Sequence, residues 1–521
     1  MKRYLSFLTV FILLLTLGSC KKSYLDTTPS DQIDAAKIFD NINNVKVALN
    51  GIYRATYMQY SDQEQDGHPA IMIVMDFMGE DIVHTATGTV YFRGAYRWTD
   101  HRSELNDLPY FSYRLYYRII ANANILLEGI DRVPDATEAQ KNVIKGECLA
   151  LRAWSHFMLV QLFGMRYDKT TLSDVTSANT TSARVQLGVP VVTKYSLDPQ
   201  PRNTVEEVYI QVNKDLDQAI TLLDGAPPRG LYRTHIDKSV AQGIKARVAL
   251  TQQNWTDAAY YAQEALKGYS LMSSSAYSDG FSDMKNSEWM WGAHQLPEQL
   301  PSYGSFFAYM SSNFNSSHTR SNPKKISISL YNSLTNTDIR KKLFCDNVND
   351  YINFPGVIDA STGQPAASQT RAVYMQKKFV VSDPAVSAGD IPYMRVAEMY
   401  LIAAEAKAKL GLLNEAADII DVLAKNRDPN YTRPDNISDI ANDQNGLIMM
   451  QRRIELWGEG FRFLDLKRLK LSLDRSGTGS TTTLANVAVT TPINADNVRW
   501  QFLIPRRELQ ANPYMKQNPL Q

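Results

Sequence analysis

The segment Gln451–Leu469, QRRIELWGEGFRFLDLKRL, constrains the fold of this chain more than any other stretch. Its apolar residues recur at three- and four-residue steps, a spacing that places them on one face of a helix. They are Ile454, Trp457, Phe461 and Leu464. Charged residues of both signs fill the remaining positions at the same spacing, where helical neighbours can form ion pairs. The pattern therefore predicts a packed helix with a solvated, salt-bridged face.

Two glycines, Gly458 and Gly460, interrupt this helical pattern. Each costs about 1 kcal/mol relative to Ala in a helix interior. Because glycine has no side chain, a pair of them is typical of a place where two backbones pack closely. We therefore expect another segment to contact the backbone at these glycines.

The same segment resembles the C-terminal signature of the SusD/RagB family, Arg-Arg-x-Glu-Leu-x-x-Glu-Gly-x-Arg-x-x-Asp-Leu-x-Arg. Two further matches stand in the expected order, YMRVAEMYLIAAEAKAKLG at Tyr393–Gly411 and FLIPRRELQANPYMKQNP at Phe502–Pro519. The resemblance implies a mainly α-helical fold, with tetratricopeptide-like hairpins as scaffold and an irregular, loop-rich ligand face. It also implies a lipid-anchored surface protein, without a cofactor, that binds glycan and partners a SusC-like TonB-dependent outer-membrane transporter.

Charge and composition exclude some partners. The 521 residues include 55 Lys and Arg against 54 Asp and Glu, so the net charge is near zero. A nucleic-acid-binding protein usually carries a basic excess, and this chain has none. Aromatic residues make up 10% of the chain, with 28 tyrosines, a supply that suits a protein presenting rings to a ligand.

The N-terminus has the layout of an export signal. A basic start is followed by the apolar run Tyr4–Leu17, which is too short to span a membrane, and then by Leu17-Gly18-Ser19-Cys20. This ending resembles a bacterial lipobox, in which Cys20 is lipidated; the alternative is an ordinary cleaved signal. We expect residues 1–19 to be the signal peptide, 20–35 a lipidated tether and 36–521 one domain. Lys21 and Lys22 are basic where related surface lipoproteins often carry acidic residues, so the sequence favours an outer-membrane lipoprotein facing the exterior without fixing the membrane face.

Several helices follow from the apolar periodicity. The pattern predicts helices over about 36–57, from residue 107, and over 143–163 and 202–223, the last capped by Thr204. Two further segments, from Ser239 and from Ala397, predict helical hairpins in which alanines recur at three- and four-residue steps. Small residues at this spacing let paired helices approach closely, as in tetratricopeptide hairpins.

Two regions, about 61–106 and 268–390, lack this rhythm and are rich in Gly, Ser, Asn, Asp and aromatic residues. Irregular segments on a rigid scaffold are where binding sites are usually built. Sugars offer hydroxyls and C–H faces, so a glycan site needs exposed rings and hydroxyl acceptors. The candidates are Tyr96, Trp98, Asp81, Tyr303, Phe306, Phe307 and Tyr309. Trp98 is the strongest candidate because its neighbours in sequence are polar, although each ring could instead belong to the core. Trp289 and Trp291 share a strand face and are predicted to be core.

Motifs for catalysis are missing from the sequence. The seven histidines show no helical metal spacing, and the chain has no phosphate-binding glycine loop, Gly-x-Ser-x-Gly elbow or Cys-x-x-Cys pair. We therefore expect no metal site and no enzyme, with Cys148 and Cys345 as buried free thiols. A lipid-anchored glycosidase remains an alternative, with Glu80 and Asp81 or Glu104 and Asp107 as its carboxylate pair. A tetratricopeptide-like envelope scaffold that binds protein partners is another. The identity of the ligand, glycan or peptide, and the binding of calcium stay open.

Overall fold

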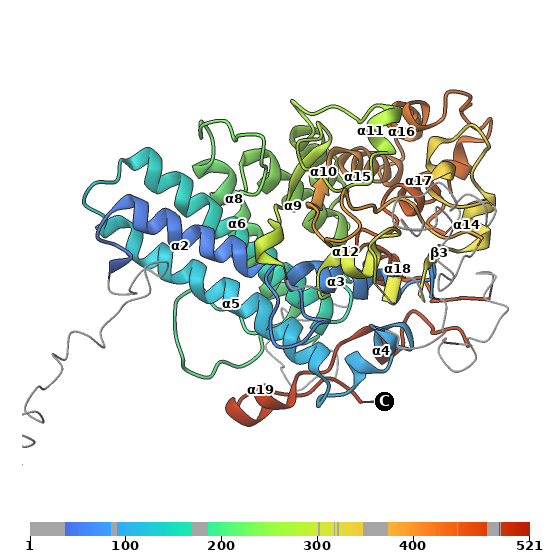
Figure 1. Ribbon diagram of the computed structural model, residues 1–521. Helices are drawn as coiled ribbons and strands as arrows, with labels where there is room; N and C mark the ends of the chain where they lie inside the picture. The colour runs from blue at the N-terminus through green and yellow to red at the C-terminus, as the bar shows by residue number, and fades with distance from the viewer. Residues whose placement is uncertain are drawn as a thin grey trace, which may run out of the picture.

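The computed structural model of the protein describes residues 37–84, 91–168, 186–300, 303–316, 318–319, 322–346, 373–444, 446–476, 489 and 491–520. The predicted signal peptide, Cys20 and the tether lie outside these ranges. Helices dominate the described chain, which confirms the mainly α-helical fold (Figure 1). The longer helices are α2 (Ile42–Ala55), α3 (Gly67–Phe77), α5 (Asp107–Gly129), α6 (Glu138–Phe163), α8 (Val205–Leu222), α9 (Lys238–Thr251), α10 (Trp255–Ala265), α15 (Val396–Lys409), α16 (Leu413–Arg427) and α17 (Leu447–Glu455). The shorter ones include α4 (Arg93–Tyr96), α11 (Ser274–Tyr277), α12 (Phe306–Met310), α14 (Ile328–Asn332), α18 (Arg462–Arg468) and α19 (Arg506–Ala511).

Helix starts follow local capping chemistry. Thr204 caps α8, as predicted, and Glu207 completes a reciprocal capping box with it. A second box, formed by Thr137 and Gln140, starts α6 five residues before the predicted boundary. The apolar periodicity begins later than the cap, so periodicity alone placed this boundary too late.

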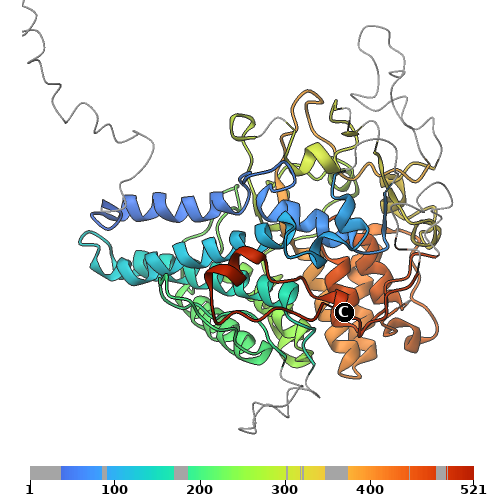
Figure 2. The same ribbon diagram turned by 90° about the horizontal axis from the view of Figure 1, so that it is seen from below.

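The scaffold is a continuous stack of helices. From α5 through α6, α8, α9, α10 and α15 to α16, each helix packs against the next (Figures 1 and 2). Both predicted hairpins are present, α9 with α10 and α15 with α16, and α10 packs directly on α15 although the hairpins are distant in sequence. Buried alanines lie in the contacting helices, among them Ala258 and Ala262 in α10 and Ala404 in α15. Their small side chains permit the close approach.

Strands are few among the described residues and form two antiparallel pairs. β1 (Ile82–His84) pairs with β3 (Lys324–Ile326), and β2 (Trp289–Ala293) pairs with β4 (Ile391–Arg395). Trp289 and Trp291 are buried, which confirms their predicted place in the core. The region 61–106 is not irregular throughout, contrary to the prediction from its sequence, because α3 is a helix buried along its whole length. Its sequence, GHPAIMIVMDF, shows no amphipathic period because no face of this helix meets solvent.

The segment Gln451–Leu469 is not the single helix that its periodicity predicts. Helix α17 ends at Glu455, and α18 starts at Arg462 after a turn. Gly458 and Gly460 have φ angles of 78° and 88°, in the left-handed region that favours glycine. The expected close approach is confirmed at Gly460, where a Cβ atom would lie 2.8 Å from the Cα of Met72 in α3.

The charged residues of this segment are also not solvated. Glu455 is fully buried, and its carboxylate contacts Arg340 (3.3 Å), Arg395 (3.0 Å) and Arg427 (3.0 Å). We call the surrounding set the buried charge network. It comprises Arg340, Lys378, Arg395, Arg427, Glu288, Asp338, Glu455 and Glu459. Four cations face four carboxylates, so the network is neutral and joins β2, β4, α16 and α17.

Cys148 and Cys345 are both buried, and the structure shows them as two thiols that are not joined in a disulfide, as predicted. Burial raises the pKa of the Cys148 thiol above its usual value, so this sulfur stays protonated and unreactive. None of the helices in the described part of the chain is long and apolar enough to cross a membrane.

Candidate functional site

Most of the predicted ligand-binding rings lie inside the core, contrary to the expectation that they are exposed. Tyr96 and Trp98 are each 1% exposed, and Phe306, Phe307 and Tyr309 are buried as well. The Trp98 indole donates to the Met78 carbonyl (2.9 Å) and packs edge-on against Trp500. Residues distant in sequence thus cover the ring, and its polar neighbours in sequence gave a misleading signal. A buried ring offers no face on which a sugar can stack.

Asp81 is also unavailable as a hydroxyl acceptor. Its carboxylate accepts from Arg453 (2.5 Å) and is buried. Glu80 is bound by Arg462. The pair Glu80 and Asp81, one of the two considered for a glycosidase, is therefore committed to internal ion pairs. In the other pair, Glu104 contacts Arg506.

Tyr303 is the one predicted ring that the structure exposes, with 58% of its surface accessible. It precedes α12, whose first residue donates its backbone N–H to Asp66 (3.1 Å). This contact holds the irregular region around 303–310 against the turn that leads into α3. The two irregular regions thus meet, although more than 200 positions separate them in sequence.

A cleft of about 360 Å³ opens beside this junction. Its lining includes four carboxylates, from Asp62, Glu64, Asp100 and Asp107, together with Tyr91. Neither lysine nor arginine lines it, and none of the four carboxylates forms an ion pair within the described ranges. We call this feature the acidic cleft. Its volume falls in the range of sites that hold small ligands.

Helix α4 and the start of α5 form the walls of the acidic cleft. Phe92 and Trp98, on either side of α4, both have φ angles of 57°. Bulky residues in this left-handed region are strained by about 1–3 kcal/mol, and such strain clusters at functional sites. At Gly94 a Cβ atom would lie 1.8 Å from an oxygen of Asp100, so only glycine lets that carboxylate pack there. Asn106 caps α5 through the N–H of Leu108 (2.9 Å), which places Asp107 in the first turn.

Two carboxylates of the acidic cleft are harder to ionise than usual because they are partly buried. Burial raises the pKa of Glu64 to about 7. The negative charges of Asp100 and Asp62 add to this rise, and the hydrogen bond from the N–H of Phe92 opposes it. Burial also raises the pKa of Asp100. Carboxylates in this state hold unused acceptor positions for hydroxyl groups.

Aromatic side chains back the cleft. The Tyr91 hydroxyl donates to Gln63 (2.7 Å), and its half-buried ring lies 5.1 Å from the ring of Tyr309. The Tyr309 hydroxyl is buried and has no hydrogen-bond partner within the described chain. A buried hydroxyl without a partner is costly unless water or a ligand satisfies it. Tyr91 therefore supplies a ring edge to the cleft, and Tyr309 an unsatisfied polar group behind it.

Three carboxylates of the acidic cleft, Asp62, Glu64 and Asp100, lie in the irregular region 61–106 but were not among the candidates, and Asp107 was named only as a glycosidase carboxylate. Asp62, Glu64 and Asp66 stand within five positions, and this local density of acids was a usable signal. Asn106 and Asp107 stand where a cap is expected before the predicted helix, a second usable signal. That the cleft carboxylates form no ion pair within the described residues could not be predicted from the sequence, because ion pairing depends on the folded chain.

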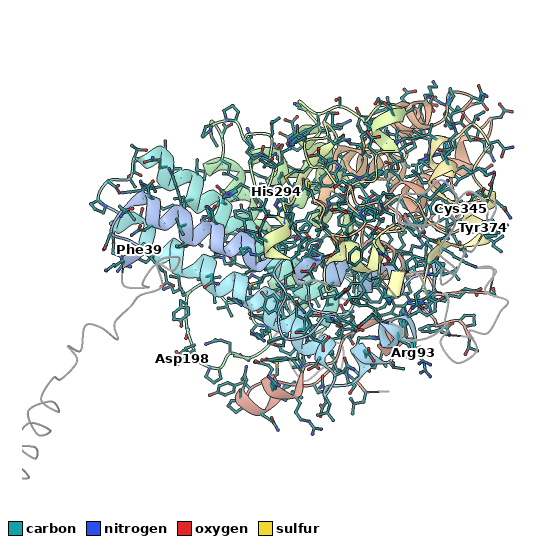
Figure 3. The ribbon with its side chains drawn as sticks, in the orientation of Figure 1. Phe39, Arg93, Asp198, His294, Cys345 and Tyr374 are labelled. Carbon is teal, nitrogen blue, oxygen red and sulfur yellow. The ribbon has the colours of Figure 1, made fainter. Side chains whose placement is uncertain are left out.

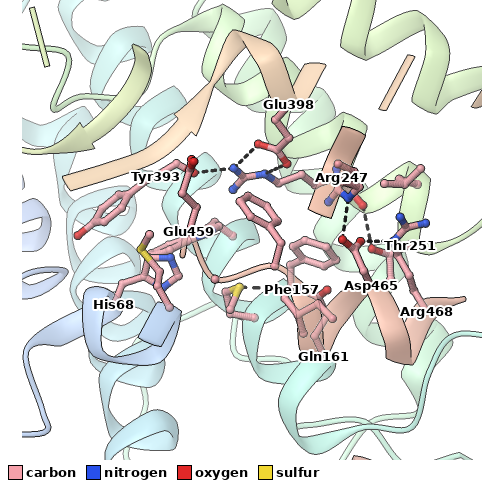
Figure 4. A pocket seen from close by; sticks show the side chains of 18 residues that line it. His68, Phe157, Gln161, Arg247, Thr251, Tyr393, Glu398, Glu459, Asp465 and Arg468 are labelled. Carbon is pink, nitrogen blue, oxygen red and sulfur yellow. Dashed lines mark hydrogen bonds and ion pairs between the residues drawn. The ribbon is translucent and has the colours of Figure 1, made fainter. Parts of the chain in front are cut away.

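Figure 4 shows a different cavity, of about 60 Å³, enclosed beneath the Gln451–Leu469 segment. Its charged groups are paired internally: Arg247 with Glu398 (2.6 Å), and Asp465 with both Arg452 (2.7 Å) and Arg468 (2.8 Å). The cavity has room for a few waters at most and lies far below the size of a ligand site. In the described part of the chain, no three His, Cys, Asp or Glu side chains gather to hold a metal ion.

The fold and the cleft together define a class of protein, one in which helical hairpins support an irregular face with a ligand-sized acidic cleft. Comparison with known proteins narrows this class. A family model described as starch-binding and associating with the outer membrane matches residues 23–250, and the SusD family model matches residues 331–520. The chain belongs to the SusD/RagB family.

Solved structures agree with this assignment over most of the chain. A SusD-like carbohydrate-binding protein from Bacteroides vulgatus ATCC 8482 is 25% identical, with a TM-score of 0.74 over 92% of this chain and 98% of that one. A SusD superfamily protein from Bacteroides thetaiotaomicron VPI-5482 is also 25% identical, with a TM-score of 0.70 over 92% and 100%. A laminarin-binding SusD-like protein, 19% identical, has the same fold with a TM-score of 0.65 over 92% and 100%.

A curated relative, a SusD-like protein of Formosa agariphila, is 29% identical over 143 residues. This match spans 26% of the present chain and 25% of the relative.

Proposed function

We propose that this protein is an outer-membrane lipoprotein that binds a glycan at the acidic cleft and delivers it to a SusC-like TonB-dependent transporter. The observation that carries the binding step is the set of four unpaired carboxylates beside Tyr91. Sugar hydroxyls donate hydrogen bonds to carboxylates, and a C–H face packs against an aromatic ring. The excess of negative charge favours a neutral glycan over a polyanion at this cleft.

Several parts of the proposal rest on the sequence and the family. Residues 1–19 would be the signal peptide, Cys20 the lipidated residue, 20–35 the tether and 36–521 the binding domain. Several acyl chains on Cys20 would hold the protein on the membrane stably, where one chain would not. Tyr303, exposed near the junction of the two irregular regions, would provide a further stacking ring.

The binding step is tested by affinity electrophoresis of the full-length protein in mild detergent, through gels that contain neutral polysaccharides, with laminarin among them. Retardation by one polymer, reduced in Asp62→Asn and Asp107→Asn, is the expected result. Asp224→Asn is the matched control, because Asp224 is an exposed carboxylate paired with Lys238 outside the cleft. Retardation that is equal in all three variants would contradict the acidic cleft as the site.

A glycosidase is the second candidate, and the raised pKa of Glu64 favours it. A carboxylic acid that keeps its proton near pH 7 beside ionised carboxylates is the arrangement of a glycosidase acid. Release of reducing ends from the retarding polymer, abolished in Glu64→Gln, would establish hydrolysis. Retardation without release is the result expected of a binding protein.

Delivery of the glycan to the transporter is tested separately. The tagged protein should co-purify with a large outer-membrane barrel after mild detergent extraction. Repeated recovery of the protein alone would remove the transporter from the proposal. Failure of every polysaccharide to retard the protein would instead favour a scaffold that binds protein partners.

A further inference from the structure

A second cleft, of about 630 Å³, lies against another face of α5. Its three walls are α5, the extended segment 190–200, and α19 near the C-terminus, which lies against α5 (Figures 1 and 2). We call it the basic cleft. Figure 3 labels Asp198 from this cleft and Arg93 from α4, which borders the acidic cleft, and both lie along the lower edge of the molecule.

The walls of the basic cleft are fixed by partly buried hydrogen bonds. The Tyr117 hydroxyl donates to the Pro190 carbonyl (2.7 Å), which ties the extended segment to α5. The Asn512 amide donates to the Gln200 carbonyl (2.8 Å) and to Glu508 (2.9 Å), which ties the same segment to α19. The cleft is therefore held open by its own hydrogen bonds, and its shape does not depend on a ligand.

Arginines give this cleft its charge. Arg114 and Arg118 point from α5 and Arg507 from α19, and all three are exposed. None of the three forms an ion pair within the described part of the chain; Arg114 donates only to the Ser61 hydroxyl (3.2 Å). Most other arginines that line cavities here are paired, as Arg247 and Arg468 are. Unpaired guanidinium groups in a preformed cleft are free to bind an anion in a bidentate manner.

Tyrosine rings accompany the arginines. Tyr110, Tyr113 and Tyr117 follow one stripe of α5 and line the cleft together with Arg114 and Arg118. The guanidinium of Arg507 lies 4.3 Å from the ring centre of Tyr110, and those of Arg114 and Arg118 lie 5.3 Å and 5.6 Å from that of Tyr60. Stacking on these rings holds the guanidinium planes in place, although Tyr60 lies outside the lining of the cleft.

We propose that the basic cleft is a second glycan-binding site, specific for sugars that carry a carboxylate or sulfate group. The arginines would bind the anion, and the half-buried rings of Tyr110 and Tyr117 would pack against the sugar. Two carboxylates, Asp198 and Glu508, also line the cleft, so its net charge is modest and a sparsely charged oligosaccharide fits better than a dense polyanion. This inference rests on the proposed function, since it extends glycan binding from the acidic cleft to a second ligand class.

The test compares ligands that differ only in charge. Binding of oligogalacturonate to the full-length protein in mild detergent is measured by isothermal titration calorimetry, beside its methyl ester, which has the same backbone without the carboxylates. A sulfated galactan oligosaccharide and its desulfated form make the second arm and separate sulfate from carboxylate as the anion. We expect at least one anionic ligand to bind about tenfold more tightly than its neutral partner, and less tightly as salt rises.

Variants then locate the site. Arg114→Gln and Arg118→Gln should each weaken binding of the anionic ligand about tenfold and leave the neutral polysaccharide of the acidic cleft unaffected. Arg132→Gln is the matched control, because Arg132 is an exposed arginine over the Phe39 ring (5.2 Å) outside both clefts. Equal affinity for the charged and neutral forms, or variants that bind like the wild type, would overturn the inference. Binding of neutral glycan without any anionic binding would overturn this inference alone, whereas loss of all glycan binding would overturn the proposed function as well.

Discussion

The buried charge network and the acidic cleft place the same residue type in opposite electrostatic states. Burial opposes ionisation of Glu455, but Arg427, Arg395 and Arg340 outweigh it and hold its pKa well below the usual value. Glu64 is also largely buried, but no cation compensates, and its pKa rises to about 7. One carboxylate is therefore ionised at every physiological pH, and the other changes charge near neutrality.

This difference in ion pairing distinguishes the charged residues that stabilise the fold from those that we propose bind a ligand. In the network each charge is satisfied by a permanent partner, so nothing remains for a ligand. In the acidic cleft the four carboxylates form no ion pair within the described residues, and the Tyr309 hydroxyl behind the cleft has no hydrogen-bond partner there, which costs stability. The family signature is thus a folding element, and the binding site that we propose lies where the sequence shows no signature.

The largest expected effect comes from breaking the network. Arg395→Met should lower the free energy of unfolding by about 3–5 kcal/mol, because Glu455, Glu459 and Glu288 would each lose a buried partner. Urea unfolding followed by circular dichroism measures this. The control is Arg506→Met, whose exposed ion pair with Glu104 should contribute at most about 1 kcal/mol. Equal losses in the two variants would show that the network is not a stabilising unit.

Trp98 should behave as a core residue. Trp98→Ala should lower the free energy of unfolding by about 3 kcal/mol, since it empties the space beside Trp500 and Met78. Glycan affinity, measured per folded molecule, should stay unchanged. A large loss of glycan affinity without a loss of stability would show that Trp98 contacts the ligand and is not a core residue.

Glu64 should make stability fall as pH rises. Below about pH 4.5 the folded and unfolded states are both protonated, and between about pH 4.5 and 7 only the unfolded state ionises. The wild type should therefore lose about 3 kcal/mol relative to Glu64→Gln across this window. Urea midpoints of both proteins at pH 4.5, 6 and 8 test the sign. Glu138→Gln, an exposed carboxylate, should show a flat difference from the wild type.

The smallest expected effects are those of the exposed rings. Tyr303→Ala and Tyr91→Ala should each weaken glycan binding about three- to tenfold, which corresponds to about 0.5–1.5 kcal/mol of ring contact. Titration calorimetry with the retarding polysaccharide measures both. Tyr514→Ala is the control, since this ring is 61% exposed and lies outside the acidic cleft. If both variants bind glycan within twofold of the wild-type affinity, ring stacking does not contribute and hydrogen bonds account for binding.

The sequence by itself determined the scaffold. Caps at Thr204, alanines at helical spacing and the apolar stripes of α5 and α8 act within a few residues, so local reading recovers them. The order of three short motifs identified the family for the same reason. Even the close approach at Gly460 could be predicted, because a glycine inside a helical pattern is visible in the local sequence.

Only the tertiary structure decided which groups are buried and which are paired. Glu455 meets arginines from 28 to 115 positions away, and Trp98 is covered by Phe463 and Trp500 from the C-terminal part of the chain. The charged spacing of Gln451–Leu469 looked solvated because its partners come from other elements. Burial and ion pairing depend on every neighbour in space, and local sequence specifies only neighbours along the chain. The acidic cleft is the clearest case, because none of its four carboxylates forms an ion pair within the described residues.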